Sequence, residues 1–408
     1  MAKFDPKTDR AEHIAKRLQP WFDQEMYEIY GSPPDAPPGH WAQQHMTRLM
    51  MGFPVWGKEY IQRFVLYGLA SIMAPPNLAA LKGRCRVVIY TENAARPVLF
   101  RLTRPAHRAG IDFVFRNIPD WVLELTKEWE SQFFVVGCVQ NICAHMASRA
   151  GMAFSMTMPD HLVGPQFYPN LIRLGQKHEA IYQAGLSIEI GAAAEHIEQF
   201  RAEDGSLSVP DIELGNLAAK HLHPQSHAHL MNLAKVPDHM PMSHRLIWQG
   251  KESIHIHSCH GNPIWLAPHL LRDPPIAFTS TMDCLTPEYV PGEFYVPTPQ
   301  DQMAFVEVSD FRKPELGQSV SADGFAEWVF NQTSFTDDYW PYFKRPSVMR
   351  CSPQPEGLDE SEIDRQYAQV MEVLETRKGK MMSEFLQRKF GNRFQQDADG
   401  PMPAAAAR

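Results

Sequence analysis

Residues 49–73 read LMMGFPVWGKEYIQRFVLYGLASIM, and they give the clearest indication of the fold class. It begins with an apolar run that favours a short buried strand. Gly57 then marks a turn, and an apolar helical pattern follows until Pro75 and Pro76 end it. The stretch therefore predicts a strand, a glycine-containing loop and a helix, which together open an α/β fold.

The alternation of strand and helix continues beyond this unit. CRVVIYTE at 85–92 and IDFVFRNI at 111–118 predict two further strands, with a helix between them. A helix over 129–150 leads into the apolar GMAFSMTMPDHL, which predicts a strand that stops at Pro159. We expect an α/β fold with a mostly parallel central sheet flanked by helices.

Later segments complete this expected fold. Residues 169–200 predict one or two helices, and β-like runs then extend the sheet to about Ser309. The chain is thus expected to comprise an N-terminal accessory arm (1–48), an α/β domain (49–315), a helical C-terminal extension (316–395) and a disordered tail (396–408).

Composition narrows the class of protein. The chain has 408 residues, 44% of them hydrophobic, which suits a folded enzyme-sized protein. A net charge of -8 argues against nucleic acid as the main partner. Six cysteines without a repeated spacing and a polar N-terminus predict a reducing, cytoplasmic setting. No apolar run reaches the roughly 18 residues that a membrane-spanning helix needs.

Histidines are concentrated in one segment. Nine of the 18 histidines lie within 221–260, and imidazole binds metals or carries protons near neutral pH. His255 and His257 alternate along a predicted strand and should share a face, which Cys259 would continue. The segment lacks both HExxH and a CxxC pair, so it does not match a simple zinc motif. A zinc-dependent hydrolase built from this cluster is one functional hypothesis.

Asp160 and His161 stand at a predicted strand end. In open α/β sheets the carboxyl ends of strands form the binding crevice, so these two residues are site candidates. The alternative is a simple Pro-Asp turn.

Several motifs occur in an order that resembles a bacterial group of glycosyltransferase-like proteins with the nucleotide-diphosphosugar transferase (A-type) fold. They are PVWGKEYIQRFVLYGLASIMAPPNLAAL, CRVVIYTENAA, FSMTMPDHL, KHLHP, SHRLIWQG, SIHIHSCHGNPIWLAP and STMDCLTPEYV, spread over about 49–313. The resemblance implies that a nucleotide sugar lies over the first half of the sheet. It also implies that an acidic motif holds Mn or Mg against the diphosphate.

The resemblance assigns roles to particular residues. Asp160 matches the metal-binding strand end, although it is a single acid where the family pattern has an Asp-x-Asp pair. His260 lies in HGNPIW, which is similar to a late His-Gly segment of glycogenin-like transferases, and it is the second expected metal ligand. Asp283 is a candidate acid/base group on the acceptor side, with a turn role as the alternative.

The expected nucleotide contacts follow the first two strands. Trp56 and Gly57 come directly after the first strand, and Thr91 and Glu92 end the second one. In the resembled fold these positions meet the base or ribose. The alternative for the first pair is a helix start, with Glu59 placed favourably near the helix dipole.

Three functions follow from these observations. The favoured one is a glycosyltransferase that moves a sugar from a nucleotide-sugar donor to a glycan, lipid-linked or protein acceptor. The others are the zinc-dependent hydrolase and a non-catalytic carbohydrate-binding protein on a transferase fold. Residues 376–393 form a basic amphipathic pattern, which predicts peripheral contact with the inner face of a membrane or packing on the chain's own domain.

Overall fold

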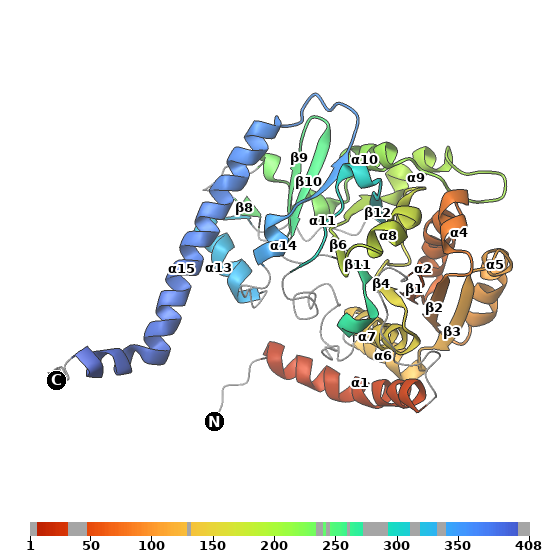
Figure 1. Ribbon diagram of the computed structural model, residues 1–408, viewed down its shortest axis with the longest axis horizontal. Helices are drawn as coiled ribbons and strands as arrows, with labels where there is room; N and C mark the ends of the chain where they lie inside the picture. The colour runs from red at the N-terminus through yellow and green to blue at the C-terminus, as the bar shows by residue number, and fades with distance from the viewer. Residues whose placement is uncertain are drawn as a thin grey trace, which may run out of the picture.

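The computed structural model describes residues 6–31, 47–128, 132–233, 240–241, 245–258, 262–271, 293–310, 319–332 and 340–398. Its centre is a six-stranded sheet in the order β3-β2-β1-β4-β11-β6 (Figure 1). These strands are β1 (Leu49–Pro54), β2 (Cys85–Thr91), β3 (Asp112–Asn117), β4 (Ala153–Ser155), β6 (Ala180–Gln183) and β11 (Asn262–Leu266). The first four strands run parallel, and β11 is antiparallel to both neighbours. The expected α/β class with a mostly parallel central sheet is confirmed.

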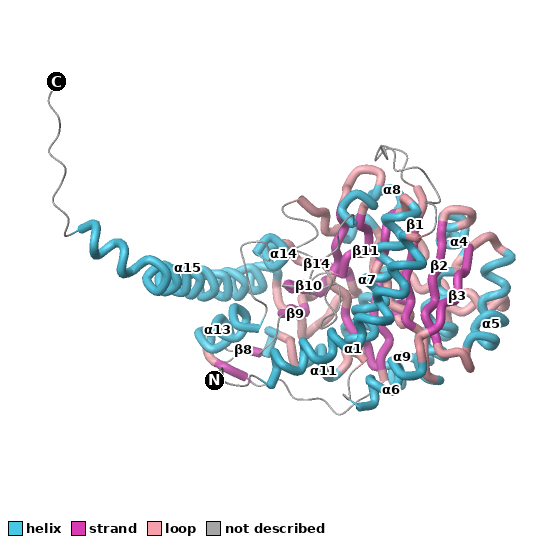
Figure 2. The backbone as a smooth tube through the Cα atoms, turned by 90° about the horizontal axis from the view of Figure 1, so that it is seen from below, coloured by secondary structure: helices cyan, strands magenta, loops and turns pink. Residues whose placement is uncertain are grey.

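Helices cover both faces of this sheet, because successive strand residues point to opposite sides. Met50 of β1 packs into one core, whereas Leu49 and Met51 pack into the core on the other face. The first core includes α1 (Pro6–Tyr30), α6 (Asp120–Glu128) and α7 (Phe133–Ala150), and the second includes α4 (Pro75–Leu81), α5 (Arg96–Arg108) and α8 (Phe167–Gly175). Figure 2 shows α7 running alongside the sheet, in contact with β1.

The opening unit has the predicted order of strand, glycine turn and helix. Gly57 has a φ of 74°, a backbone conformation that suits glycine, and it leads from β1 into the helix. The helix begins as α2 (Lys58–Arg63), widens into the π-helical turn η2 (Phe64–Leu69) and ends as α3 (Ala70–Ile72). The helix ends before Pro75 and Pro76, as predicted, but Pro75 then starts a further helix, α4, where a loop was expected.

The remaining strands form separate smaller sheets, so the expectation of one sheet that continues to Ser309 is wrong. One sheet has the order β5-β12-β7, another β14-β10-β9, and a third pairs β13 with β8. Their bounds are β5 (His161–Val163), β7 (Leu186–Glu189), β8 (Met240–Pro241), β9 (Arg245–Gln249), β10 (Ser253–Ser258), β12 (Phe305–Ser309), β13 (Ser319–Val320) and β14 (Ser347–Arg350). Strands β9 and β10 pair as an antiparallel hairpin, and that short connection keeps them away from the central sheet.

The segment 169–200 also differs from its prediction. It contains the end of α8, then β6 and β7, and only then a further helix, α9 (Ile190–Glu198). Each of the two strands has four residues, which is too short for helical and strand periodicity to be told apart. The other helical elements are α10 (Asp211–Lys220), α11 (Pro224–His227), η3 (Met231–Leu233), η4 (Pro268–Leu271) and η6 (Pro299–Asp301).

The described residues of the C-terminal part are mainly helical but include two short strands, β13 and β14. This part contains α13 (Ala322–Gln332), α14 (Trp340–Lys344) and the 39-residue α15 (Glu360–Ala398), which extends away from the rest of the molecule in Figure 1. Strand β14 lies among them and pairs with β10, so the prediction of a purely helical extension is wrong. This strand was missed because its partner lies about 90 residues earlier in the chain.

Helices lie at both ends of the described chain, in the predicted N-terminal arm and in the predicted basic segment. The N-terminal accessory arm contains α1, which buries Leu18, Trp21 and Phe22 in the core shared with α7. Residues 376–393 lie within α15, but the side chains from 380 onward are outside the described part, so membrane contact there stays a prediction. The division of the chain into domains also stays a prediction.

In the described ranges no single helix could cross a membrane, and only the bent pair Lys58–Ile72 and Pro75–Leu81, at 80°, could do so by length and composition.

Candidate functional site

A crevice lies at the carboxyl ends of β1 and β4. The chain passes from β1 to β2 on one side, whereas β4 lies on the other side of β1, so the sheet has a topological switch point here. Ligands of open α/β sheets bind outside the strand ends at such a point. A pocket of about 180 Å³ occupies this position, and the side chains that define its chemistry are Trp56, Tyr60, Asp160, His161, Arg245 and Glu307.

Asp160 lies in the turn that joins β4 to β5. Gly68 of η2 lies so close to this turn that a Cβ at position 68 would collide with the carbonyl oxygen of Pro159. From the other direction, the Val308 N–H donates a hydrogen bond of 2.9 Å to the Asp160 carbonyl oxygen. The turn is therefore held between η2 and β12.

The carboxyl group of Asp160 is buried, with 5% of the residue exposed. Burial, followed by repulsion from Glu307, raises the pKa of Asp160 to about 8, although Arg63 and a backbone hydrogen bond act in the opposite direction. Asp160 is therefore mainly protonated at neutral pH. In that form it can donate a hydrogen bond or a proton to a ligand.

Glu307 is a second acid in the same crevice, and the sequence analysis missed it. It lies on β12 opposite His161 of β5, and Ser187 Oγ donates a hydrogen bond of 2.9 Å to Glu307 Oε2. The one available signal is that Glu307 is the sole charged residue in the strand FVEVS. That pattern does not identify its neighbour, because Asp160 is far away in sequence.

His161 is a neutral member of the site. Its Nδ1 accepts a hydrogen bond of 3.2 Å from the Met158 N–H, so the proton of the neutral ring is on Nε2. Burial, followed by the Arg245 charge, lowers the pKa of His161 to about 3. The ring packs against Phe305, with 4.7 Å between the ring centroids. His161 can therefore donate one hydrogen bond to a ligand without adding charge.

An aromatic surface forms another wall of the crevice. The rings of Trp56 and Tyr60 lie nearly parallel, at 14° and with 6.4 Å between their centroids. Gln132 Nε2 donates a hydrogen bond of 2.8 Å to the Tyr60 hydroxyl. Burial, followed by Asp160 and Glu307, raises the pKa of Tyr60 to about 12, so this hydroxyl stays protonated. Flat rings of this kind stack against nucleobases and against the apolar faces of sugars.

Two arginines supply positive charge near these acids. Arg245 comes from β9 and lines the crevice, and its Nη1 donates a hydrogen bond of 2.8 Å to the Gly185 carbonyl oxygen. Arg63 is buried at the end of α2, where its guanidinium pairs with Asp310 and lies 3.9 Å from a carboxylate oxygen of Glu59. Arg245 is the cation that faces the pocket.

The residues predicted from sequence are only partly brought together. Asp160 and Trp56 both line the crevice. Gly57 is next to it, and its N–H donates a hydrogen bond of 3.3 Å to Glu92 Oε1. Thr91 is fully buried, and Glu92 lines a different pocket with residues of α2 and α5.

Two other candidates lie outside the described residues. They are His260 and Asp283, which fall in 259–261 and 272–292, respectively. Their proposed roles as metal ligand and acid/base group therefore stay predictions.

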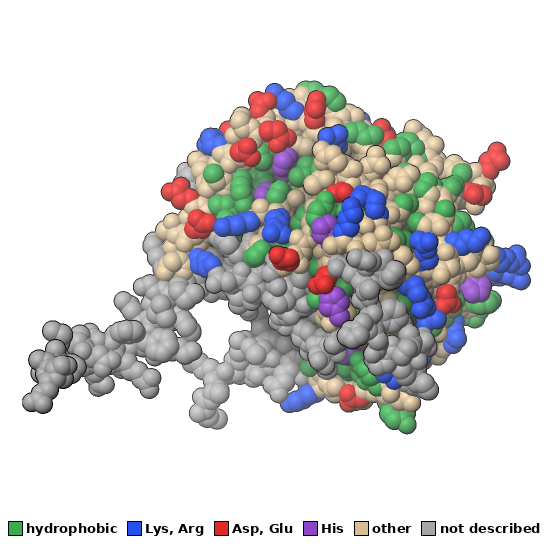
Figure 3. Space-filling model, in the orientation of Figure 1, with side chains coloured by type: hydrophobic (Ala, Val, Ile, Leu, Met, Phe, Trp, Pro, Cys, Tyr) green, Lys and Arg blue, Asp and Glu red, His purple; other side chains and the backbone are tan. Residues whose placement is uncertain are grey.

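The histidines of 221–260 that the structure describes make separate contacts. His223 bonds the Asp310 carbonyl oxygen at 2.9 Å, and His257 donates a hydrogen bond of 2.8 Å to the Phe343 carbonyl oxygen. His255 lies 3.2 Å from a carboxylate oxygen of Glu360. Figure 3 shows histidine side chains at separate places on one face of the molecule.

The described side chains also do not form a metal-binding set. Among them, no group of three or more His, Cys, Asp and Glu residues could hold a metal ion. In the crevice, a metal would also have to displace the proton of Asp160, whose pKa is raised, and the proton on Nε2 of His161.

No family model and no curated protein matches the chain. One similar solved structure is that of a Bacillus anthracis protein assigned as a glucose-1-phosphate thymidylyltransferase, determined with sucrose bound. It has 8% sequence identity and a TM-score of 0.27, and the match covers 72% of this chain and 98% of that chain. A similarity this low supports no conclusion about function.

Proposed function

We propose that the chain is a glycosyltransferase that binds a nucleotide-sugar donor in the crevice at the carboxyl ends of β1 and β4. One observation carries the proposal: the stacked Trp56–Tyr60 surface, the Asp160–Glu307 acid pair and the Arg245 cation share one pocket at the switch point of the sheet. Stacking surfaces suit a base or sugar, and a cation suits a diphosphate. The acids suit proton transfer at the sugar.

The size of the pocket restricts how such a donor would lie. A volume of about 180 Å³ is below the roughly 300–1,000 Å³ of typical ligand pockets. It therefore accommodates a sugar unit and its nearest phosphate, while the nucleoside lies along Trp56, which is half-buried at the rim. This arrangement places the transferred sugar beside the acids.

The proposed reaction assigns a step to each acid. The oxygen of an acceptor hydroxyl attacks the anomeric carbon, the bond from that carbon to the diphosphate oxygen breaks, and its electron pair stays on the diphosphate. Glu307 accepts the proton of the acceptor hydroxyl, and protonated Asp160 donates a hydrogen bond to the departing oxygen. Arg245 stabilises the negative charge that develops on the diphosphate.

Calorimetry with a panel of nucleotide sugars tests the proposal. One donor should bind the wild-type protein, and Asp160→Asn and Glu307→Gln should each reduce transfer to an acceptor by about 100-fold or more. The matched controls are Asp364→Asn and Glu203→Gln, which change exposed acids outside the crevice. Each titration is repeated with Mn and with chelator, because the metal predicted from the sequence resemblance is a separate question.

The outcomes separate the competing functions. A donor that binds without turnover over all acceptors would support the non-catalytic carbohydrate-binding protein. If no donor binds, and purified protein instead holds zinc that is lost in His255→Ala and His257→Ala, the zinc-dependent hydrolase replaces the proposal.

A further inference from the structure

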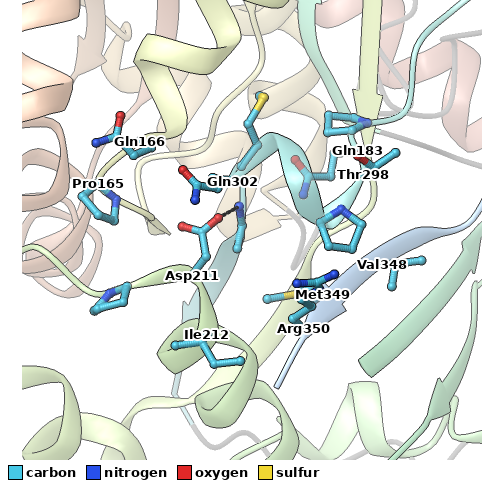
Figure 4. A pocket seen from close by; sticks show the side chains of 15 residues that line it. Pro165, Gln166, Gln183, Asp211, Ile212, Thr298, Gln302, Val348, Met349 and Arg350 are labelled. Carbon is cyan, nitrogen blue, oxygen red and sulfur yellow. Dashed lines mark hydrogen bonds between the residues drawn. The ribbon is translucent and has the colours of Figure 1, made fainter. Parts of the chain in front are cut away.

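A second and larger pocket lies apart from the crevice. Its volume is about 400 Å³. It is formed where the loop after β5, the end of β6, the N-terminal end of α10, η6 and β14 meet (Figure 4). Its polar side chains are Gln166, Gln183, Asp211, Thr298, Gln302 and Arg350.

Gln183 is the member of this pocket whose burial points to a ligand. It is 5% exposed, and its Oε1 atom is buried and has no hydrogen-bond partner among the residues that the structure describes. A buried amide oxygen without a partner costs free energy, and a ligand that donates a hydrogen bond would remove that cost. Figure 4 shows Gln183 and Gln166 on opposite sides of the pocket, with Gln302 and Asp211 between them.

The backbone beside the pocket has one unusual conformation. Gln302 has a φ of 52° and is the only residue other than glycine with a positive φ in the described part of the chain. Such a conformation in a non-glycine residue is held by its surroundings and often occurs at ligand sites. Here it follows η6, whose Thr298 and Asp301 form a capping box.

The position of Asp211 also depends on a specific neighbour. A Cβ at position 164 would collide with Asp211 Oδ1, so the carboxylate can lie there only because residue 164 is glycine. The Ala304 N–H donates a hydrogen bond of 3.0 Å to the other oxygen, Asp211 Oδ2. The chain thus holds a carboxylate at the wall of the pocket with Oδ1 on the side of Gly164.

The lining indicates the chemical class of the ligand. Three amides and a hydroxyl can both donate and accept hydrogen bonds, which matches a molecule with several hydroxyl groups. The one acid and the one arginine balance in charge, so a neutral ligand fits. The described lining has prolines, methionines and aliphatic side chains but no aromatic ring on which a nucleobase could stack.

We propose that this pocket binds a saccharide unit through Gln183, Asp211 and Gln302. The inference goes beyond the proposed transfer reaction and does not rest on it. One extension does rest on it: Gln183 on β6 pairs with Asn262 on β11, and Asn262 lines the crevice. A longer saccharide held here would extend toward the crevice as an acceptor.

Saturation-transfer NMR and calorimetry with maltose, cellobiose, lactose, mannobiose and diacetylchitobiose test the site. At least one disaccharide should bind the wild-type protein with a millimolar or lower Kd. Gln183→Leu keeps the volume and removes the amide, and it should weaken that binding at least tenfold. Gln176→Leu makes the same change at an exposed position of the chain and should leave the Kd unchanged.

Gln302→Gly is a second test of the site, which remains valid if Gln183→Leu does not fold. Glycine adopts a positive φ without strain, so this variant should keep or raise the Tm while it weakens disaccharide binding at least tenfold. A purely structural role of Gln302 would leave the Kd unchanged. Asp160→Asn should also leave it unchanged, which separates this site from the donor crevice.

Three results would overturn the inference. The first is that no disaccharide of the panel binds. The second is that binding persists in both Gln183→Leu and Gln302→Gly but is lost in Asp160→Asn, which would place the sugar in the crevice. The third is that uridine monophosphate binds with the same dependence on Gln183, which would make the ligand a nucleotide.

Discussion

Asp160 and Glu307 are neighbouring acids in one crevice, and the charge of Glu307 adds to burial in raising the pKa of Asp160. The two residues are joined through the backbone, because the Asp160 carbonyl oxygen accepts a hydrogen bond from the residue that follows Glu307. A movement of one acid therefore changes the surroundings of the other. The relationship makes the protonation of Asp160 depend on a residue from a distant strand.

Removal of the Glu307 charge should lower the pKa of Asp160. In Glu307→Gln the repulsion is absent while the burial of Asp160 remains, so the pKa should fall and yet stay above the ordinary range of an aspartate. Carbon-13 NMR of labelled aspartate side chains would follow this titration. A midpoint that does not move would show that burial alone sets the pKa.

The raised pKa of Asp160 should also make the free energy of unfolding depend on pH. The folded chain binds this proton more tightly than the unfolded chain, so Asp160 contributes stability below about pH 4 that is lost as the pH rises toward about 8. Compared with Asp160→Asn, the wild type should lose a few kcal/mol of unfolding free energy over that range. Urea unfolding at several pH values measures it, and Asp364→Asn should follow the wild type.

His257 should have the opposite pH dependence. Burial lowers its pKa to about 4, so the folded chain binds this proton less tightly than the unfolded chain. The neutral ring, stacked on Tyr367 of α15, is stable above the ordinary pKa of histidine, and this contribution is lost as the pH falls toward 4. The difference in unfolding free energy between wild type and His257→Gln should therefore shrink with acidification. The exposed His13→Gln should show no such trend.

Gly68→Ala tests how the Asp160 turn is held. The added Cβ would collide with the Pro159 carbonyl oxygen, so the turn must shift, and we expect a loss of about 1–3 kcal/mol in stability. Binding of the donor should weaken in the same variant. Gly379→Ala on α15 meets nothing within 4 Å and should instead stabilise the helix by up to about 1 kcal/mol. Equal effects in the two variants would contradict this account.

Trp56→Ala tests the stacking surface. Loss of one stacked ring costs about 1–3 kcal/mol, so donor affinity should fall roughly 5-fold to 150-fold. Trp121→Ala removes a 40% exposed tryptophan from α6, away from the crevice, and should leave the affinity unchanged. Unchanged affinity in Trp56→Ala would remove the aromatic wall from the proposed donor site.

Local pattern was sufficient for part of this molecule. Three of the parallel strands are predicted by the apolar run before Gly57 and by the β-rich runs at 85–92 and 111–118. The end of the helix that follows the first strand is predicted by the prolines. Placement of Asp160 near a strand end also followed from local signals. These features depend on residues that are close together in the chain, so they can be predicted from the local sequence pattern.

The remainder depends on contacts between distant residues. Glu307 lies beside Asp160 only because β12 pairs with β5, and β14 becomes a strand only because β10 offers it an edge. The described histidines of 221–260 looked like one cluster, yet hairpin geometry and separate packing partners direct His223 and His257 to different places. Local sequence patterns therefore predict the α/β class and the opening unit. Which acids meet depends on the tertiary structure, because pairing between strands brings together residues that no local pattern connects.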